Sequence, residues 1–237
     1  MLNREKHQLI MGRILKDIYS DIRIAPLLGF KGGTCAYFFY DLSRFSVDLD
    51  FDLISFPNND EVKKEVYEKV LHILKDYGGI KDQYIKQNTI FFLLSYGDAE
   101  HNIKIEISTR FLHNVPELFE IKELFGISMF VAKKNYLLAG KLAALTGRTT
   151  VTARDVYDIY YFLKRNWEID QAILESLTGQ KTKTYLAKCI ETIESIKDNK
   201  ILHGLGELIS NEEKNWIKKN LKAETVFLLK NYLAAIE

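Results

Sequence analysis

Cysteine, proline and long apolar runs are all scarce in this sequence. Its 237 residues include two cysteines, Cys35 and Cys189, and three prolines. No Cys-x-x-Cys, His-Glu-x-x-His or other Cys/His cluster occurs, so a structural zinc site is not expected. No stretch approaches the roughly 18 apolar residues that cross a membrane, and no apolar signal segment opens the chain. We therefore expect a cytoplasmic protein with reduced thiols and no membrane partner.

The sequence also lacks an excess of charge of one sign. Its 33 Lys and Arg against 32 Asp and Glu give a formal net charge of +1, so no global field indicates nucleic acid or membrane. Apolar residues make up 47% of the chain, with 14 Phe, 13 Tyr and 2 Trp. This composition excludes a disordered chain and allows one large domain or two small ones.

The apolar pattern changes part-way along the chain. From about Lys133 onward the sequence is almost wholly helical in character, whereas strand-like and helical segments alternate before it. We therefore predict an α+β domain over residues 1–131 and a helical domain over 132–237. In the first domain, helices are expected at 5–20, 35–42 and 61–77. A short strand that enters a glycine turn is expected at 27–34, and further strands are expected at 46–54, 89–96, 103–108 and 127–131.

An acidic strand carries the strongest chemical signal. Residues 46–54 (SVDLDFDLI) alternate between acidic and apolar side chains, which places Asp48, Asp50 and Asp52 on one face of a strand. Carboxylates two residues apart project about 7 Å from each other, a spacing at which both can bind Mg²⁺ or Mn²⁺. The alternative is an exposed acidic face opposite a buried apolar one, and a short motif by itself more often means that.

A glycine pair precedes this strand. Gly32 and Gly33 lie between an expected strand and an expected helix, where backbone N–H groups without neighbouring Cβ atoms can contact an anion. Thr34 is either the cap of that helix or a phosphate ligand. A phosphate-binding turn and an acid pair one short helix apart favour a site for a metal-bound phosphate.

A third carboxylate would complete such a site. The strand at residues 103–107 turns its isoleucines to one face and leaves Lys104 and Glu106 on the other. Glu106 joins the metal site if this strand neighbours the acidic one. An ordinary solvent-exposed Lys/Glu face is equally consistent with the pattern.

A second polar cluster lies in the helical half. On a helix, Lys141, Leu145 and Arg148 share one stripe. Asp155, which follows Arg154, and Asp158 are three residues apart and are neighbours on a helix. Lys and Arg neutralise phosphate charge. The alternative is a surface ion-pair network in which Arg148 or Arg154 contacts Asp155 or Asp158.

These segments follow the motif order of a known family. FKGGT through DLDFD (residues 30–52), followed by KLAALxxR and RDxxD (residues 141–158), resemble the AbiEii/AbiGii toxin family of nucleotidyltransferases over about residues 25–165. The resemblance implies an α+β, DNA polymerase β-like nucleotidyltransferase fold with a C-terminal helical bundle. It also implies a toxin of a bacterial type IV toxin–antitoxin or abortive-infection (phage-defence) system, with a cognate antitoxin as partner.

The family resemblance further implies a reaction and roles for individual residues. A nucleotide would pass from an NTP to an acceptor, which is the tRNA 3′ end for some relatives, with Mg²⁺ or Mn²⁺ as cofactor. The implied metal ligands are Asp48 and Asp50, with Glu106 as the open third. The implied catalytic residues are Asp48, Asp50, Lys141, Asp155 and Asp158. The residues implied to bind or position the triphosphate are Gly32, Gly33, Thr34, Arg44, Ser46, Lys141 and Arg154.

The local charge distribution agrees with a phosphate-transferring enzyme. Residues 133–188 contain ten Lys/Arg and five Asp/Glu, a net of +5, whereas residues 41–60 contain five Asp and one Arg, a net of −4. We expect the active site in a cleft between the two domains, with RNA on the basic side. Two alternatives are a catalytically silent nucleotide- or partner-binding module and a metal-dependent phosphodiesterase that uses the same acids.

Overall fold

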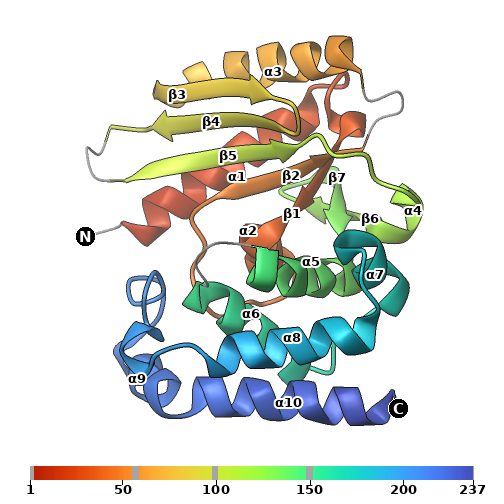
Figure 1. Cartoon of the computed structure of the whole chain (residues 1–237). Helices are drawn as coiled ribbons and strands as arrows, with labels where there is room; N and C mark the ends of the chain where they lie inside the picture. Colours follow the sequence, from red (N-terminus) through yellow and green to blue (C-terminus); the bar gives the residue numbers. More distant parts are fainter. Residues whose placement is uncertain (1–2, 55–58, 98–100, 148–151, 237) are drawn as a thin grey trace. The chain divides into compact units, whose positions relative to one another are not determined.

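The chain divides into two compact units. The computed structural model describes residues 3–54, 59–97, 101–147 and 152–236 (Figure 1). The sheet unit comprises Met1–Asp41 and Phe45–Lys133, and the helical unit comprises Leu42–Arg44 and Lys134–Glu237. The sequence predicts a single boundary after residue 131, so the presence of residues 42–44 in the helical unit was not expected.

One seven-stranded sheet organises the sheet unit in the described part of the chain. Its strand order is β3-β4-β5-β2-β1-β7-β6, and its pairings are antiparallel except for β1 with β7 and β2 with β5. The strands are β1 (Leu28–Lys31), β2 (Leu49–Leu53), β3 (Gly79–Lys86), β4 (Thr89–Ser95), β5 (Asn102–Ser108), β6 (Phe119–Leu124) and β7 (Ile127–Ala132).

Among the described residues, the α-helices of this unit are α1 (Arg4–Ser20), α2 (Gly32–Phe39), α3 (Asp60–Lys75) and α4 (Val115–Leu118), and a short 3-10 helix spans Ala25–Leu27. The side chains of Asn3 and Asn59 accept hydrogen bonds from backbone N–H groups in the first turns of α1 and α3, which defines where both helices begin. α1 packs on β7 and α3, and α2 packs on β1 and β2. Fully buried apolar side chains, among them Met11, Phe30 and Phe51, form the core.

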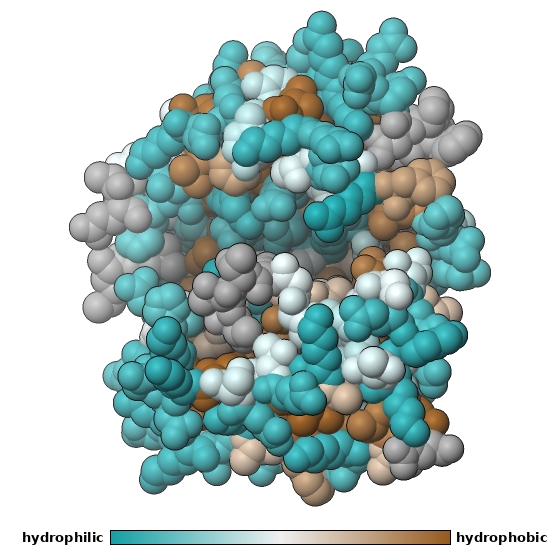
Figure 2. Space-filling view, in the orientation of Figure 1, coloured by the Kyte–Doolittle hydropathy of each residue, from teal (hydrophilic) through white to brown (hydrophobic). Residues whose placement is uncertain are grey.

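In its described residues the helical unit contains α5 (Lys134–Gly147), α6 (Ala153–Lys164), α7 (Gln171–Thr178), α8 (Thr182–Glu194), α9 (Asn211–Trp216) and α10 (Lys222–Ala235). It also contains a 3-10 helix at Asp198–Lys200 and a π-helical segment at Ile217–Leu221. α5 packs against α6, α7 and α8, and α10 packs against α6 and α8. The molecular face in Figure 2 is largely hydrophilic, as expected when the apolar helix faces are turned inward.

The predicted elements are mostly present, with three differences. α2 begins at Gly32, so the glycines open the helix instead of forming a turn before it. β2 begins at Leu49, so Asp48 lies just before the strand. β3 and β6 were not predicted as strands, and both are edge strands of the sheet.

The state of the two cysteines and the length of the helices can be described for the same residues. Cys35 and Cys189 are buried free thiols. Within the described ranges, the helices are all too short or too polar to cross a membrane.

Candidate active site

Strand pairing brings the predicted acids together on one face of the sheet. β2 and β5 are parallel neighbours, and their register places Asp50 opposite Glu106. The strand that carries Glu106 is therefore the neighbour of the acidic strand, which is the condition under which Glu106 could join the metal site. Lys104 lies among these side chains, with its Nζ 3.1 Å from Glu106 Oε2, 3.7 Å from Asp50 Oδ1 and 3.9 Å from Asp48 Oδ2. We call these four residues the acidic cluster.

Lys104 is a positively charged member of this cluster. Burial alone would lower the pKa of Lys104, but Asp50, Asp48 and Glu106 together hold that pKa above its ordinary value. Among the described residues, no three His, Cys, Asp or Glu side chains are grouped to hold a metal ion as they stand. The carboxylates surround an ammonium group, and their hard oxygen atoms are the donor type that Mg²⁺ prefers.

Gly32 lies directly against the acidic cluster. Its φ is +79°, and a Cβ atom built at this position would lie 2.4 Å from Asp50 Oδ2. Only glycine allows both this backbone conformation and this approach. The sequence predicted a contact of this backbone with an anion, and the anion that it lies against in the structure is the carboxylate of Asp50.

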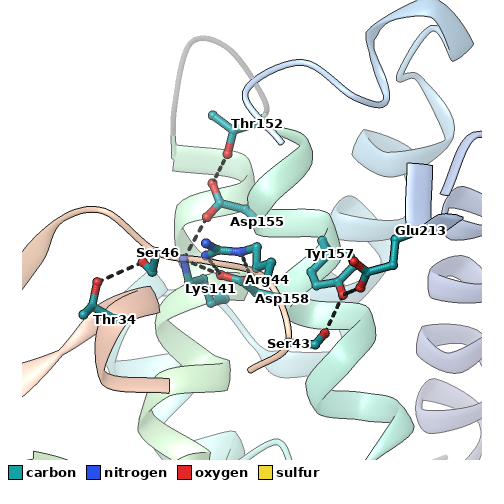
Figure 3. A network of polar contacts seen from close by, with 10 residues as sticks. All are labelled: Thr34, Ser43, Arg44, Ser46, Lys141, Thr152, Asp155, Tyr157, Asp158 and Glu213. Atoms are coloured by element: carbon teal, nitrogen blue, oxygen red, sulfur yellow. Dashed lines mark hydrogen bonds and ion pairs between the residues drawn. The ribbon is translucent and has the colours of Figure 1, made fainter. Parts of the chain in front are cut away.

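Thr34 holds the segment that carries Asp48. The Thr34 side chain is buried, and its hydroxyl lies within hydrogen-bonding distance of the Ser46 hydroxyl (2.9 Å; Figure 3) and of the Asp48 backbone carbonyl. Ser46 is also buried. In this arrangement the two hydroxyls position the chain before β2, a role different from the direct phosphate contact that the family resemblance implied.

His7 supports the same segment and was missed by the sequence analysis. It is buried, and its ring contacts the Val47 carbonyl through Nε2 (3.0 Å) and the Tyr96 hydroxyl through Nδ1 (2.7 Å). Burial lowers the pKa of His7, which favours the neutral ring. No local motif surrounds His7, because its partners lie 40 and 89 residues away.

Asp52 has a different environment from Asp48 and Asp50. Although it follows Asp50 on the same strand face, it is buried and forms an ion pair with Lys31 at 2.5 Å. A buried carboxylate needs such a partner. The structure therefore gives Asp52 a local counter-ion of its own.

The second predicted cluster is a buried ion network in the helical unit (Figure 3). Asp158 on α6 accepts two hydrogen bonds from the Arg44 guanidinium, at 2.5 and 2.7 Å. Lys141 Nζ on α5 lies 2.8 Å from Asp158 Oδ2 and 3.2 Å from Asp155 Oδ1. Thr152 donates a hydrogen bond of 2.7 Å to Asp155. We call Arg44, Lys141, Asp155 and Asp158 the ion network.

Burial and charge act in opposite directions in the ion network. Burial alone would raise the pKa of Asp158, but Arg44 and Lys141 hold it below its ordinary value. Likewise, burial alone would lower the pKa values of Arg44 and Lys141, and their carboxylate partners raise both. With two cations and two carboxylates, the network balances its own charge.

This network differs from the surface alternative that the sequence left open. In that alternative Arg148 or Arg154 pairs with the aspartates, whereas the described network is buried and its arginine is Arg44. Arg148 lies outside the described residues. Arg154 is half-buried on the first turn of α6. Arg44 was named for a triphosphate role, but its pairing with Asp158 has no local signal, since 114 residues separate the two.

The acidic cluster lies wholly in the sheet unit, and the ion network lies wholly in the helical unit. That the two clusters line one cleft stays a prediction.

Comparison with known proteins identifies the family. The model of the family described as "Nucleotidyl transferase AbiEii toxin, Type IV TA system" matches residues 13–223. The chain belongs to this family. Among curated proteins, none matches the chain. AbiEii membership confirms the resemblance that the glycine, aspartate and lysine motifs indicated, and it implies a cognate antitoxin as partner.

Solved structures show that the AbiEii chain has the nucleotidyltransferase fold. A putative nucleotidyltransferase from H. pylori has a TM-score of 0.60 at 20% identity, with 100% of this chain and 99% of that chain covered. MenT4, a nucleotidyltransferase toxin from Mycobacterium tuberculosis H37Rv, has a TM-score of 0.61 at 16% identity, with 99% and 93% covered. JHP933 from Helicobacter pylori has a TM-score of 0.56 at 19% identity, with 100% and 97% covered.

Proposed function

We propose that this chain transfers a nucleotide from an NTP to an RNA acceptor, with tRNA as the first candidate, and acts as a toxin in a bacterial defence system. The observation that carries the proposal is the acidic cluster. Asp48, Asp50 and Glu106 surround one cationic group beside the backbone of Gly32, in a chain of the nucleotidyltransferase toxin family.

The cluster residues have distinct parts in this proposal. Asp48 and Asp50 hold Mg²⁺ or Mn²⁺, and Glu106 supplies the third carboxylate of the group. When bound, the ion would offset the negative charge of the triphosphate oxygens during attack on the α-phosphorus. Thr34 and His7 keep Asp48 in place through the backbone of the preceding segment.

The transfer itself requires in-line attack on the α-phosphorus. The acceptor hydroxyl forms a bond to that phosphorus, the bond to the bridging oxygen of the β-phosphate breaks, and pyrophosphate leaves. The proton of the hydroxyl passes to a carboxylate of the acidic cluster. Lys141 neutralises phosphate charge, and Arg44, Asp155 and Asp158 position Lys141 through the ion network.

Charge supports RNA as the acceptor. Residues 133–188 carry the net charge of +5 found in the sequence, and a basic surface attracts a polyanion in a salt-dependent manner. MenT4, which has the same fold, is described as a nucleotidyltransferase toxin.

The direct test is label transfer. The chain is incubated with each α-labelled NTP, Mg²⁺ and total tRNA, and labelled RNA is the expected product. Asp48→Asn removes one carboxylate charge of the acidic cluster and should abolish labelling. Asp82→Asn is the matched control, because Asp82 is an exposed aspartate on the edge strand β3, and labelling should remain.

Other outcomes favour the alternatives. NTP binding without label transfer to any RNA or protein, with normal growth when the chain is expressed alone, indicates a catalytically silent binding module. RNA cleavage or nucleotide release without NTP indicates a phosphodiesterase. Either result contradicts the proposal.

A further inference from the structure

Lys104 has no part in the reaction described above, yet it occupies the centre of the acidic cluster. Its side chain leaves β5 on the same face as Glu106, two residues along the strand, and reaches all three carboxylates within 3.9 Å. It is one-third exposed. The ammonium group thus offsets part of the negative charge of these three acids in the structure.

An ammonium group and a divalent ion cannot share this position. The carboxylate oxygens lie 3.1 to 3.9 Å from Lys104 Nζ, whereas Mg²⁺ binds its oxygen ligands at about 2.0–2.1 Å. Two cations among three carboxylates would also repel each other. Lys104 must therefore leave the centre of the cluster before the aspartates can close on a metal ion.

We propose that Lys104 acts as an internal counter-ion that couples metal uptake to NTP binding; this inference rests on the function proposed above. Without nucleotide, Lys104 occupies the cation position and weakens metal binding. When a triphosphate is present, Lys104 exchanges its carboxylate partners for phosphate oxygens, which leaves Asp48 and Asp50 to the metal. Lys104 is a positioning and regulatory residue in this scheme.

The coupling is reciprocal. If NTP increases the affinity for metal by a given factor, metal increases the affinity for NTP by the same factor. Removing the charge of Lys104 should therefore change the Mn²⁺ affinity measured without nucleotide, and also the factor by which nucleotide increases that affinity. A lysine with a merely structural role on β5 would leave this coupling unchanged.

The experiment measures Mn²⁺ affinity by electron paramagnetic resonance, with and without a non-hydrolysable NTP analogue, on the full chain. Lys104→Met keeps the aliphatic stem and removes the charge. We expect its nucleotide-free Mn²⁺ affinity to rise by roughly tenfold or more, because repulsion from a nearby ammonium is lost. We also expect the analogue to strengthen Mn²⁺ binding less than in the wild type. Lys104→Arg keeps the charge and should resemble the wild type.

Lys122 provides a matched control. Its Nζ lies 3.1 Å from Glu120 Oε1, again two residues along one strand, and its side chain is 31% exposed against 33% for Lys104. Lys122→Met should leave both Mn²⁺ constants unchanged. Lys104→Gln, with circular dichroism as the check on folding, provides a second neutral variant if Lys104→Met does not fold.

Two results separate this inference from the proposed function. Suppose that Asp50→Asn loses Mn²⁺ binding, so that the metal site itself is established. If folded Lys104→Met and Lys104→Gln then bind Mn²⁺ without nucleotide no more tightly than the wild type does, Lys104 is not a counter-ion. Wild-type Mn²⁺ affinity in Asp50→Asn overturns the metal site itself, and with it both proposals.

Discussion

Arg44 and Asp158 are joined by two hydrogen bonds, although 114 residues separate them in the chain. Both side chains are buried. Residues 42–44 belong to the helical unit, while the chain on either side belongs to the sheet unit. The ion pair with Asp158 therefore fixes this short segment to the helical unit. The same carboxylate also contacts Lys141, so Asp158 holds two buried cations of the helical unit.

Replacing Asp158 should therefore destabilise the protein strongly. Asp158→Asn leaves the buried charge of Arg44 without its counter-ion, which should cost about 3–5 kcal/mol of unfolding free energy. Urea denaturation measures the change. Glu194→Gln is the control, since its pair with Lys230 (2.9 Å) is exposed, and a change below about 1 kcal/mol is expected. Equal losses of unfolding free energy in both variants would contradict the argument that burial makes the Asp158 ion pair important for stability.

The same residue predicts a loss of stability in acid. The folded-state pKa of Asp158 lies below its ordinary value, so the folded state binds its proton less readily than the unfolded state does. The stabilisation is complete above the unfolded-state pKa of about 3.9 and is lost as pH falls through the folded-state value. Unfolding free energies of wild type and Asp158→Asn, measured from about pH 7 to about pH 2.5, should converge toward the acidic end. A difference that stays constant with pH would contradict this linkage.

Gly32 should tolerate no side chain. In Gly32→Ala, the new Cβ would lie 2.4 Å from Asp50 Oδ2 at a φ of +79°. The left-handed conformation alone costs about 1–2 kcal/mol, and displacement of Asp50 by about 1 Å should lower transfer roughly 10²-fold. Label transfer and thermal unfolding measure both effects. The control Gly79→Ala has no atom within 4 Å of its new Cβ, and similar activity losses in the two variants would refute the close-approach argument.

Thr34 should act through its hydroxyl and not through its size. Thr34→Val has nearly the same shape but leaves the Asp48 carbonyl and the Ser46 hydroxyl without this partner. We expect a loss of about 1–3 kcal/mol of unfolding free energy together with reduced label transfer. Thr34→Ser retains the hydroxyl and should retain most of both. If serine fails as completely as valine, the methyl group of Thr34 matters as much as its hydroxyl, and the prediction is wrong.

Much of the sheet unit could be predicted from short-range patterns. The β-like apolar run in residues 89–96 corresponds to β4, and the alternation in residues 103–108 corresponds to β5. The helical spacing at residues 5–20 corresponds to α1. β3 was missed because an edge strand packs less of its surface and therefore carries a weaker alternation; most of its side chains are exposed. The same reason applies to β6.

The candidate site shows the same division between local and distant information. Asp48 and Asp50 could be proposed from their alternation with Leu49 and Phe51, because the period of a strand decides which side chains share a face. In the structure β2 begins at Leu49, directly after Asp48. Lys104 could not be placed among them, because its position depends on which strand pairs with β2 and in which register. His7 was missed for a related reason, since its two partners come from distant segments.

By itself, the sequence determined the chemical groups of this protein: a glycine pair, two aspartates on one strand, a lysine and two aspartates on helices, and their order, which identifies the AbiEii family. Only the tertiary structure decided their partners. Lys104 stands among the carboxylates, Asp50 lies against Gly32, and Arg44 neutralises Asp158. The physical reason is that motifs reflect local backbone geometry, whereas charge pairing and burial depend on segments that meet only when the chain folds.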